Sequence, residues 1–476
     1  MKFNIIKFIK KPHFPIVIFA IAIFFILLQM NFQLGADDGV WIKEIEEKGI
    51  FKYLYDRNVN WQPGFGYVWF ALIYNNIMLW RLISSILAAI GMFCISKYMI
   101  EDDNNKIFNI CVFISCVFFF LSPYVITSGV MWVVGGIAYL WPTVLMLIAL
   151  MPFVYALYNK KIKKKGYNVI IFLSTIQVCF GPQILAILIC FGGLVILYLL
   201  INKKHIPGVI ISQYIMILLL AIIVVDLTIS AGRYNAEKYW YVNFDMLNTY
   251  DKLFQGINWT NFHFINSSNL IFLIITILIY INIYKKNKDN VLLCILAIIP
   301  MIYFIINIIP FEIIIQNINI NNSNAEYWTN ERNSYKIENV LFNYVYNTNH
   351  ANPQNILLKK IDLLPSFIGL VIMLYTSILL FITFDKKEDK FITVVLYFAA
   401  LCSGYMLSFS PTIFASGSRI FFISNILMIF IAAKLFTYSL NNGFTYSRIA
   451  SYSFIIFTII LWSQFVLFFP KSILWL

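Results

Sequence analysis

An all-α bundle of transmembrane helices is the fold class that the sequence predicts, and three observations predict it. Apolar residues make up 61% of the 476-residue chain and charged residues only 12%, whereas soluble domains contain roughly 45–50% apolar residues. The mean hydropathy is +0.79. The apolar residues also form runs of about 20, which is the length that one helix needs to cross a bilayer. We therefore expect one integral membrane domain over residues 1–476.

The net charge of +13 would indicate a nucleic-acid partner in a soluble protein. Here the lysines and arginines instead gather at the ends of apolar runs, as they do in cytoplasmic loops of membrane proteins. The densest group, with five lysines between 160 and 165, is the clearest cytoplasmic marker. The charge therefore reports membrane topology, and we expect no nucleic-acid partner.

The apolar runs predict about 13 spans, with the N-terminus in the cytoplasm and the C-terminus outside. Four lysines precede the first run, and no small-residue cleavage site follows it, which favours an uncleaved first helix. Two short spans form a hairpin that breaks at Gly181-Pro182 between two basic loops. The predicted spans are 13–34, 78–98, 107–125, one that ends before 160, the hairpin between 165 and 203, 208–230, 268–284, 291–311, 364–384, 391–409, 419–437 and 449–468.

Three long loops are predicted on the outer side, whereas the inner loops are short. The first spans 35–77, and its apolar residues recur at helical spacing from Trp41 to Leu54, which indicates helices lying in the membrane interface. The other two span 231–267 and 312–362. Because the long loops are external, the chemistry is expected outside the cell membrane.

Asp37 and Asp38 lie where the first predicted helix leaves the bilayer. A neighbouring like charge and partial desolvation both raise the pKa of a carboxyl group, which suits a general base. The alternative is structural, because Asp also caps helix N-termini and a helix is expected from Gly39. Both interpretations remain open from these residues alone.

Four short motifs stand out in this layout. They are Asp37-Asp38 with Trp61, the segment from Trp132 through Tyr139 to Trp141-Pro142, Ala231-Gly232-Arg233, and Ser418-Arg419. These motifs and the layout resemble those of the GT-C class of polytopic glycosyltransferases. They are similar to bacterial glucosyltransferases that modify O-antigen with lipid-linked sugars, and to a related bacterial GT-C-like family. One departure is Gln62-Pro63-Gly64, which stands where an Arg is expected after the first-loop Trp.

The resemblance implies transfer of a sugar from a polyprenyl-phosphate donor to an extracytoplasmic glycan, lipid or polymer of the cell envelope. Asp37 or Asp38 would be the base, and guanidinium groups would hold the leaving phosphate. The expected phosphate ligands are Arg233 and Arg419, with Lys238 and Arg57 as secondary ligands. The expected aromatic contacts to the substrate are Trp61, Trp132, Tyr139 and Trp141.

Structural alternatives exist for these residues as well. Arg233 and Arg419 would also serve as anchors that reach the lipid head groups, and the aromatic residues would also form an interfacial belt. Asp226 lies inside a predicted span, where an ionisable group indicates function or a structural partner such as Arg233.

No metal site is predicted from cysteine or histidine. The seven cysteines lie in apolar segments without CxxC spacing, and the four histidines are scattered singly. A divalent cation between Asp37 and Asp38 stays an open alternative. The competing functions are a polymerase of lipid-linked oligosaccharides, which would also use outer-loop arginines, a transporter or flippase, and a structural membrane protein.

Overall fold

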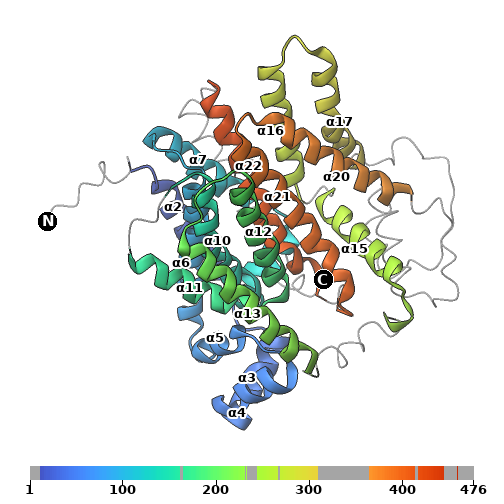
Figure 1. The fold of residues 1–476 in the computed structure, drawn as a ribbon. Helices are drawn as coiled ribbons and strands as arrows, with labels where there is room; N and C mark the ends of the chain where they lie inside the picture. Colours follow the sequence, from blue (N-terminus) through green and yellow to red (C-terminus); the bar gives the residue numbers. More distant parts are fainter. Residues whose placement is uncertain are drawn as a thin grey trace.

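The computed structural model describes residues 11–160, 165–230, 232, 244–265, 269–308, 364–412, 416–443 and 458. These residues form helices and no β-strand, which confirms the all-α fold class. The long helices pack side by side in a bundle, with α3 and α4 at one end and the turn between α16 and α17 at the other (Figure 1).

Within the described ranges, six helices are long and apolar enough to cross a membrane, or seven if a bent pair counts as one span. This supports a membrane protein, because each of the six is at least as long as the bilayer core requires. Helices occupy every predicted span up to residue 437, whereas 449–468 lies outside the described residues except for 458. The main helices are α2 (Phe14–Leu27), α6 (Ile77–Tyr98), α7 (Asn104–Phe118), α10 (Trp141–Leu157), α11 (Lys165–Cys179), α12 (Pro182–Ile201), α13 (Gly208–Ser230), α16 (Ile271–Lys286), α17 (Val291–Ile308), α20 (Leu364–Thr383), α21 (Lys387–Tyr405) and α22 (Phe422–Asn441).

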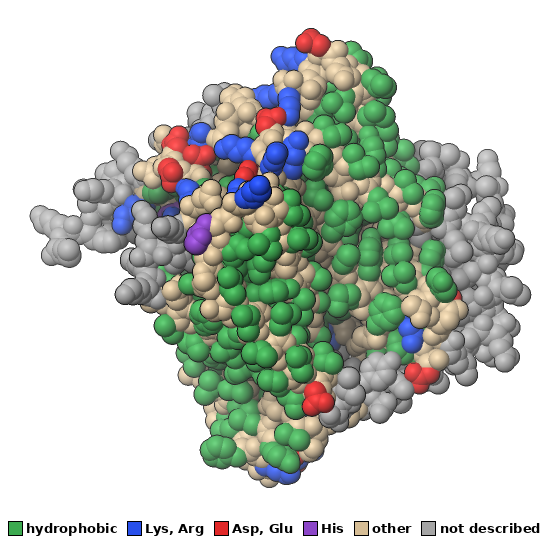
Figure 2. Space-filling model, in the orientation of Figure 1, with side chains coloured by type: hydrophobic (Ala, Val, Ile, Leu, Met, Phe, Trp, Pro, Cys, Tyr) green, Lys and Arg blue, Asp and Glu red, His purple; other side chains and the backbone are tan. Residues whose placement is uncertain are grey.

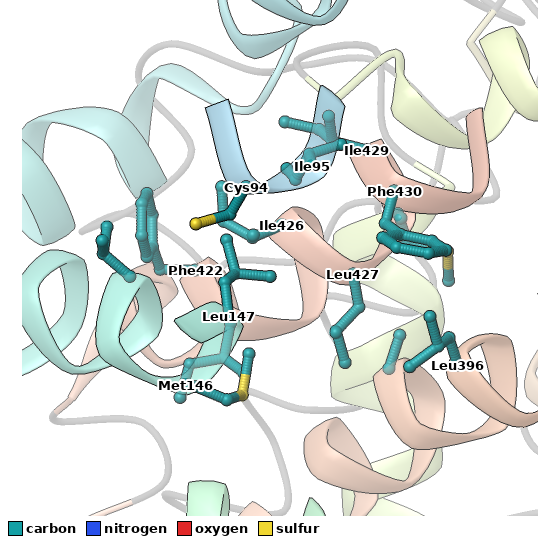
Figure 3. Packing of buried hydrophobic residues seen from close by; sticks show 14 of the residues in the cluster. Cys94, Ile95, Met146, Leu147, Leu396, Phe422, Ile426, Leu427, Ile429 and Phe430 are labelled. Atoms are coloured by element: carbon teal, nitrogen blue, oxygen red, sulfur yellow. The ribbon is translucent and has the colours of Figure 1, made fainter. Parts of the chain in front are cut away.

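Helix α22 is the centre of the bundle. It contacts α6, α7, α10, α16 and α21, and its apolar stretch is buried on every side. A helix that is hydrophobic all round is expected in such a position. Figure 3 shows the packing, in which one surface of α22 meets side chains of α6, α10 and α21. The labelled residues are Cys94, Ile95, Met146, Leu147, Leu396, Phe422, Ile426, Leu427, Ile429 and Phe430.

A sharp bend follows α7. Helices α7 and α8 (Pro123–Ile126) meet at 93°, because Ser122 has extended ψ before a proline. After α8 the chain continues as η2 (Thr127–Met131), the extended residue Trp132, α9 (Val133–Gly135) and η3 (Gly136–Leu140). We call 123–140 the broken segment. Its backbone folds so closely that a Cβ on Gly135 would lie 1.8 Å from the carbonyl oxygen of Ser128, so only glycine fits there.

The first predicted outer loop contains helices, as the apolar spacing indicates. They are α3 (Asp37–Lys48), α4 (Ile50–Tyr55), the π-helix η1 (Asp56–Trp61) and α5 (Phe65–Ile73). They project together from one end of the bundle (Figure 1). The whole region from the end of α2 to the start of α6 is therefore a folded unit on the bundle.

The second predicted outer loop, 231–267, also contains helical structure. The short helix η5 (Phe244–Met246) precedes α15 (Thr249–Phe264). Asn248 and Asp251 form a capping box, in which each side chain accepts a hydrogen bond from the other residue's backbone. Helix α15 packs against α20 and α21. The third predicted loop, 312–362, lies outside the described residues.

Figure 2 shows a large group of charged side chains at the end of the bundle opposite α3, whereas the flank below this group is mostly apolar. At that end Lys434 of α22 forms a buried ion pair with Asp389 of α21, with 2.9 Å between Nζ and Oδ1. The hydroxyl of Tyr158 donates to the same carboxylate at 2.5 Å. Lys204 pairs with Glu388 at 2.6 Å. This network joins the ends of α10, α12, α21 and α22.

Candidate functional site

The two aspartates of the first loop have different environments. Asp38 is fully buried, whereas Asp37 is exposed at the first residue of α3. The Asp38 carboxylate accepts two backbone hydrogen bonds, from the N–H of Gln33 at 2.8 Å and from the N–H of Val134 at 3.1 Å. Helix α3 begins at Asp37 after Ala36, and no side chain caps it. Neither aspartate therefore caps α3 through a side-chain hydrogen bond, although both lie in its first turn.

A tight turn places Asp38 under the Gln33 amide. The N–H of Gly39 donates to the carbonyl oxygen of Ala36 at 3.0 Å. A Cβ on Gly39 would lie 1.9 Å from the carbonyl oxygen of Leu34, so a side chain at this position would open the turn. The glycine that directly follows the acidic pair is thus part of what aims Asp38 at the broken segment.

Burial raises the pKa of Asp38 from 3.8 to about 6. The backbone amides of Gln33 and Val134 and the side chain of Trp132 act in the opposite direction, and the nearby charge of Asp37 raises the pKa further. Within the described part of the chain, no lysine or arginine lies within ion-pair distance of Asp38. The carboxylate is therefore balanced by amide dipoles and not by a cation.

Arg419 reaches the same part of the broken segment from the other end of the sequence. It lies on η10 (Gly417–Phe421), which packs against α8 and η2. The central carbon of its guanidinium group lies 4.7 Å from the centroid of the Trp132 ring, as in a cation–π contact. The side chain is half-buried.

Arg419 differs from the other two arginines that the structure describes. Arg57 pairs with Glu44 at 2.8 Å, and Arg81 donates to the Met30 carbonyl at 2.6 Å and to Asn31 at 3.0 Å. Arg419 has the Trp132 ring but no carboxylate or carbonyl partner among the described residues. Its hydrogen-bond donors therefore remain available for an anionic ligand.

These contacts join Asp38, Trp132 and Arg419, and together with Asp37, the neighbour of Asp38 in the chain, we call them the Trp132 site. Asp38 binds the amide two residues after Trp132, and Arg419 lies over the Trp132 ring. The Asp38–Val134 hydrogen bond joins positions 96 residues apart. The structure thus brings together the acidic pair, the broken segment and the late outer turn, three of the regions predicted to hold the site.

Arg57 and Trp61 form a separate cluster in the first loop. The Arg57 guanidinium lies 5.5 Å from the ring centroid of Trp41, 6.0 Å from that of Trp61 and 5.9 Å from that of Tyr67. Because Arg57 also pairs with Glu44, its charge is already balanced. In this arrangement Arg57 holds η1 against α3 and α5.

Tyr139 and Trp141 belong to the same stretch as Trp132 but lie elsewhere. The Trp141 ring is 2% exposed, its Nε1 donates to Ser84 at 2.9 Å, and it packs edge-on against Trp69. Trp141 is thus a core residue in this conformation. Tyr139 is half-buried on η3, and its carbonyl oxygen accepts from Thr143 at 2.6 Å.

Arg233 and Lys238 lie outside the described residues. The residue before Arg233 is described, and the N–H of Gly232 donates to the carbonyl oxygen of Asn60 in the first loop at 3.1 Å. Asp226 is exposed on α13. The alternative that Asp226 partners Arg233 therefore also lies outside the described residues.

Sequence reasoning missed three contributors to the site. The amides of Gln33 and Val134 bind Asp38 through their backbone, which leaves no signal in the residue type. Gln183 donates to the carbonyl oxygens of Ser403 at 3.3 Å and Ile420 at 3.2 Å, and so links η10 to α21. Its signal was available, since a polar Gln directly after the Gly-Pro break of an apolar hairpin is unusual.

No group of three or more His, Cys, Asp or Glu side chains in the described ranges is arranged to hold a metal ion. Comparison of the chain with protein-family models, with curated proteins and with solved structures finds no match. The function is therefore argued from the Trp132 site itself.

Proposed function

We propose that this chain is a membrane glycosyltransferase that moves a sugar from a polyprenyl-phosphate donor to an extracytoplasmic glycan, lipid or polymer. The main support is the Trp132 site, where an exposed carboxylate, a buried carboxylate and an arginine without a polar partner come from distant parts of the chain. A base and a phosphate ligand are the two groups that this transfer requires.

The proposal includes a membrane topology of about 13 spans in the cell membrane, with the N-terminus inside. On that topology the Trp132 site faces outward, and the network of Lys434, Asp389 and Tyr158 faces the cytoplasm. A lipid-linked donor would then present its phosphate at the bilayer edge, beside α3 and η10.

The two aspartates take different roles in this mechanism. Asp37 is exposed and free of the backbone bonds that occupy Asp38, so Asp37 is the base that receives the acceptor's proton. Asp38 is a positioning residue, because its two hydrogen bonds hold the start of α3 against the broken segment. The two roles therefore predict different effects for substitutions of Asp37 and of Asp38.

In the transfer step, the acceptor oxygen forms a bond to the anomeric carbon while the bond from that carbon to the phosphate oxygen breaks. The electron pair of the broken bond stays on the phosphate, and the acceptor's proton goes to Asp37. Arg419 stabilises the extra negative charge on the phosphate through its N–H donors. The Trp132 ring, over which the guanidinium group lies, fixes the orientation of that group.

The test compares Asp37→Asn with Glu46→Gln, an exposed carboxylate on the same helix. An amide cannot accept the proton, so Asp37→Asn should lower transfer by about 10²–10⁴-fold in membranes that contain donor and acceptor. Its melting temperature should stay at the wild-type value, because Asp37 makes no bond to the bundle.

Glu46→Gln should leave both transfer and melting temperature unchanged. Near wild-type transfer by Asp37→Asn would show that Asp37 is not the base. Loss of transfer in Glu46→Gln as well would show that the assay reports the charge of α3 in general.

A further inference from the structure

The short helix η10 carries Arg419, so the place of the guanidinium group depends on what holds that helix. It is a 3₁₀ helix of five residues. The hydrogen bonds of a 3₁₀ helix have poorer geometry than those of an α-helix, which is why such helices are short. Gly417 enters η10 with a φ of +61°, in the left-handed region that favours glycine. The position of Arg419 therefore depends on contacts from neighbouring helices.

Gln183 binds the backbone of η10 directly beside Arg419. Its side-chain Nε2 donates to the carbonyl oxygen of Ile420 at 3.2 Å and to that of Ser403, in the last turn of α21, at 3.3 Å. An amide nitrogen carries two hydrogens, so it can serve both acceptors at once. One side chain of α12 thus ties η10 to α21, one residue away from Arg419.

The base from which Gln183 extends is well fixed. Gln183 lies in the first turn of α12, and Pro182 is the first residue of that helix, where its restricted φ suits a helix start. The N–H of Leu185 donates to the carbonyl oxygen of Gly181 at 2.9 Å. Helix α12 packs against α10, α13 and α21. The Gly181-Pro182 break therefore delivers an anchored amide to η10.

The other end of η10 is held independently of Gln183. The Phe421 ring stacks on His263 of α15, with 4.1 Å between the ring centroids, and the Phe421 carbonyl oxygen accepts from Asn425 of α22 at 2.9 Å. Loss of the Gln183 bonds should therefore leave η10 folded but let Arg419 shift. Such a shift matters, because a functional group must be held within about 0.5 Å of its productive position.

We propose that Gln183 is a positioning residue, which holds Arg419 where its guanidinium group lies over Trp132 and meets the phosphate of the donor. The inference rests on the proposed function for the identity of that ligand. Gln183 acts on the ligand only through Arg419, and this dependence separates a positioning role from a merely structural one.

The test uses Gln183→Met, which keeps the length of the side chain but removes the amide, with Gln213→Met of α13 as the matched control. Gln213 is also a glutamine whose Nε2 bridges two acceptors, the carbonyl oxygen of Ala149 and the hydroxyl of Thr175, both at 2.8 Å. It is fully buried. Its bonds join α13 to α10 and α11, and not to η10.

The probes are farnesyl phosphate and uncharged farnesol, whose affinities for the full-length proteins are measured in lipid nanodiscs. Gln183→Met should bind farnesyl phosphate about tenfold more weakly than the wild type and farnesol equally well. Gln213→Met should keep both affinities. Because the bonds that it loses are shorter and fully buried, Gln213→Met should lower the melting temperature more than Gln183→Met does.

A double-mutant cycle shows whether Gln183 acts through Arg419. Arg419→Ala should itself weaken the binding of farnesyl phosphate. Adding Gln183→Met to Arg419→Ala should change that affinity by less than about twofold, because no guanidinium group remains to be positioned. A glutamine with a purely structural role would weaken the wild type and Arg419→Ala by the same factor.

The inference is overturned, and the proposed function stands, if Arg419→Ala loses affinity for farnesyl phosphate but Gln183→Met does not. It is also overturned if Gln183→Met weakens farnesol binding by the same factor, or if its effect persists in Arg419→Ala. Equal affinity of the wild type for the two probes would refute the phosphate site and the inference together. Phosphate binding that depends on both residues in a protein that transfers no sugar would retain the positioning role and refute only the proposed reaction.

Discussion

The two ends of the bundle handle buried charge in opposite ways. At one end Asp389 is matched by Lys434 at 2.9 Å and by the Tyr158 hydroxyl, so positive and negative groups satisfy each other. At the other end Asp38 is held by two backbone amides, and Arg419 lies against an aromatic ring. In the described part of the chain, neither of these two side chains has an oppositely charged partner.

The difference separates structural charges from charges that a ligand can use. A closed ion pair stabilises the packing of α21 against α22 but offers nothing to a substrate. A charge balanced by dipoles or a ring keeps its own electrostatic field, at some expense of stability. The Trp132 site has that property, which is why we assign the chemistry there.

The largest effect on stability is expected from Lys434→Met. Removal of one partner leaves a buried, uncompensated carboxylate, and such changes destabilise by about 3–5 kcal/mol. Transfer per folded molecule should stay at the wild-type level, because Lys434 lies at the opposite end from the Trp132 site. Denaturant unfolding of the purified protein, with a transfer assay on the same sample, measures both quantities.

The double variant Lys434→Met/Asp389→Asn is the control. It removes both charges but keeps an acceptor for Tyr158, so it should regain a large part of the lost stability. If the double variant is less stable than Lys434→Met, the pair is not a closed structural unit, and the comparison between the two ends fails.

The next effect concerns pH and Asp38. The pKa of Asp38 is raised in the folded state, so its contribution to stability is greatest below pH 3.8 and is lost as the pH rises toward about 6. The shift from 3.8 to about 6 corresponds to a loss of about 3 kcal/mol over that window. Above the window, the contribution of Asp38 should no longer change.

The measurement compares the melting temperatures of the wild type and of Asp38→Asn. A range from about pH 4 to about pH 7 brackets the titration of Asp38, so the difference between the two proteins isolates its contribution to stability. The wild type should lose stability relative to the variant as the pH rises through about 6. A constant difference between the two proteins would show that Asp38 titrates normally and is not desolvated.

The long apolar helices of the bundle were predictable from the sequence, because each needs a long apolar run that the sequence displays directly. The site was predictable only in part. Asp38, Trp132 and Arg419 were named from short motifs, but their meeting depends on a hydrogen bond between positions 96 residues apart. Local periodicity contains no information on such a pairing, nor on the division of labour between Asp37 and Asp38.

Helix α15 was the principal omission. Its stretch was predicted as part of an outer loop, because Asn, Gln and Thr lower its apolar periodicity. The capping pattern of Asn248 and Asp251 was the available local signal. The burial of Asn258 could not be predicted, since it arises from the packing of α15 on α20 and α21.

The most direct test of the central claim is the affinity of the purified protein for a polyprenyl phosphate in lipid nanodiscs. The free prenol of the same length serves as the ligand without charge. Wild type should bind the phosphate more tightly than the prenol. Arg419→Ala should lose about 10–100-fold in affinity for the phosphate only. The phosphate affinity of Arg419→Lys should lie between those of the wild type and Arg419→Ala. Equal binding of phosphate and prenol by the wild type, or unchanged phosphate affinity in Arg419→Ala, would contradict the assignment of Arg419 and with it the Trp132 site.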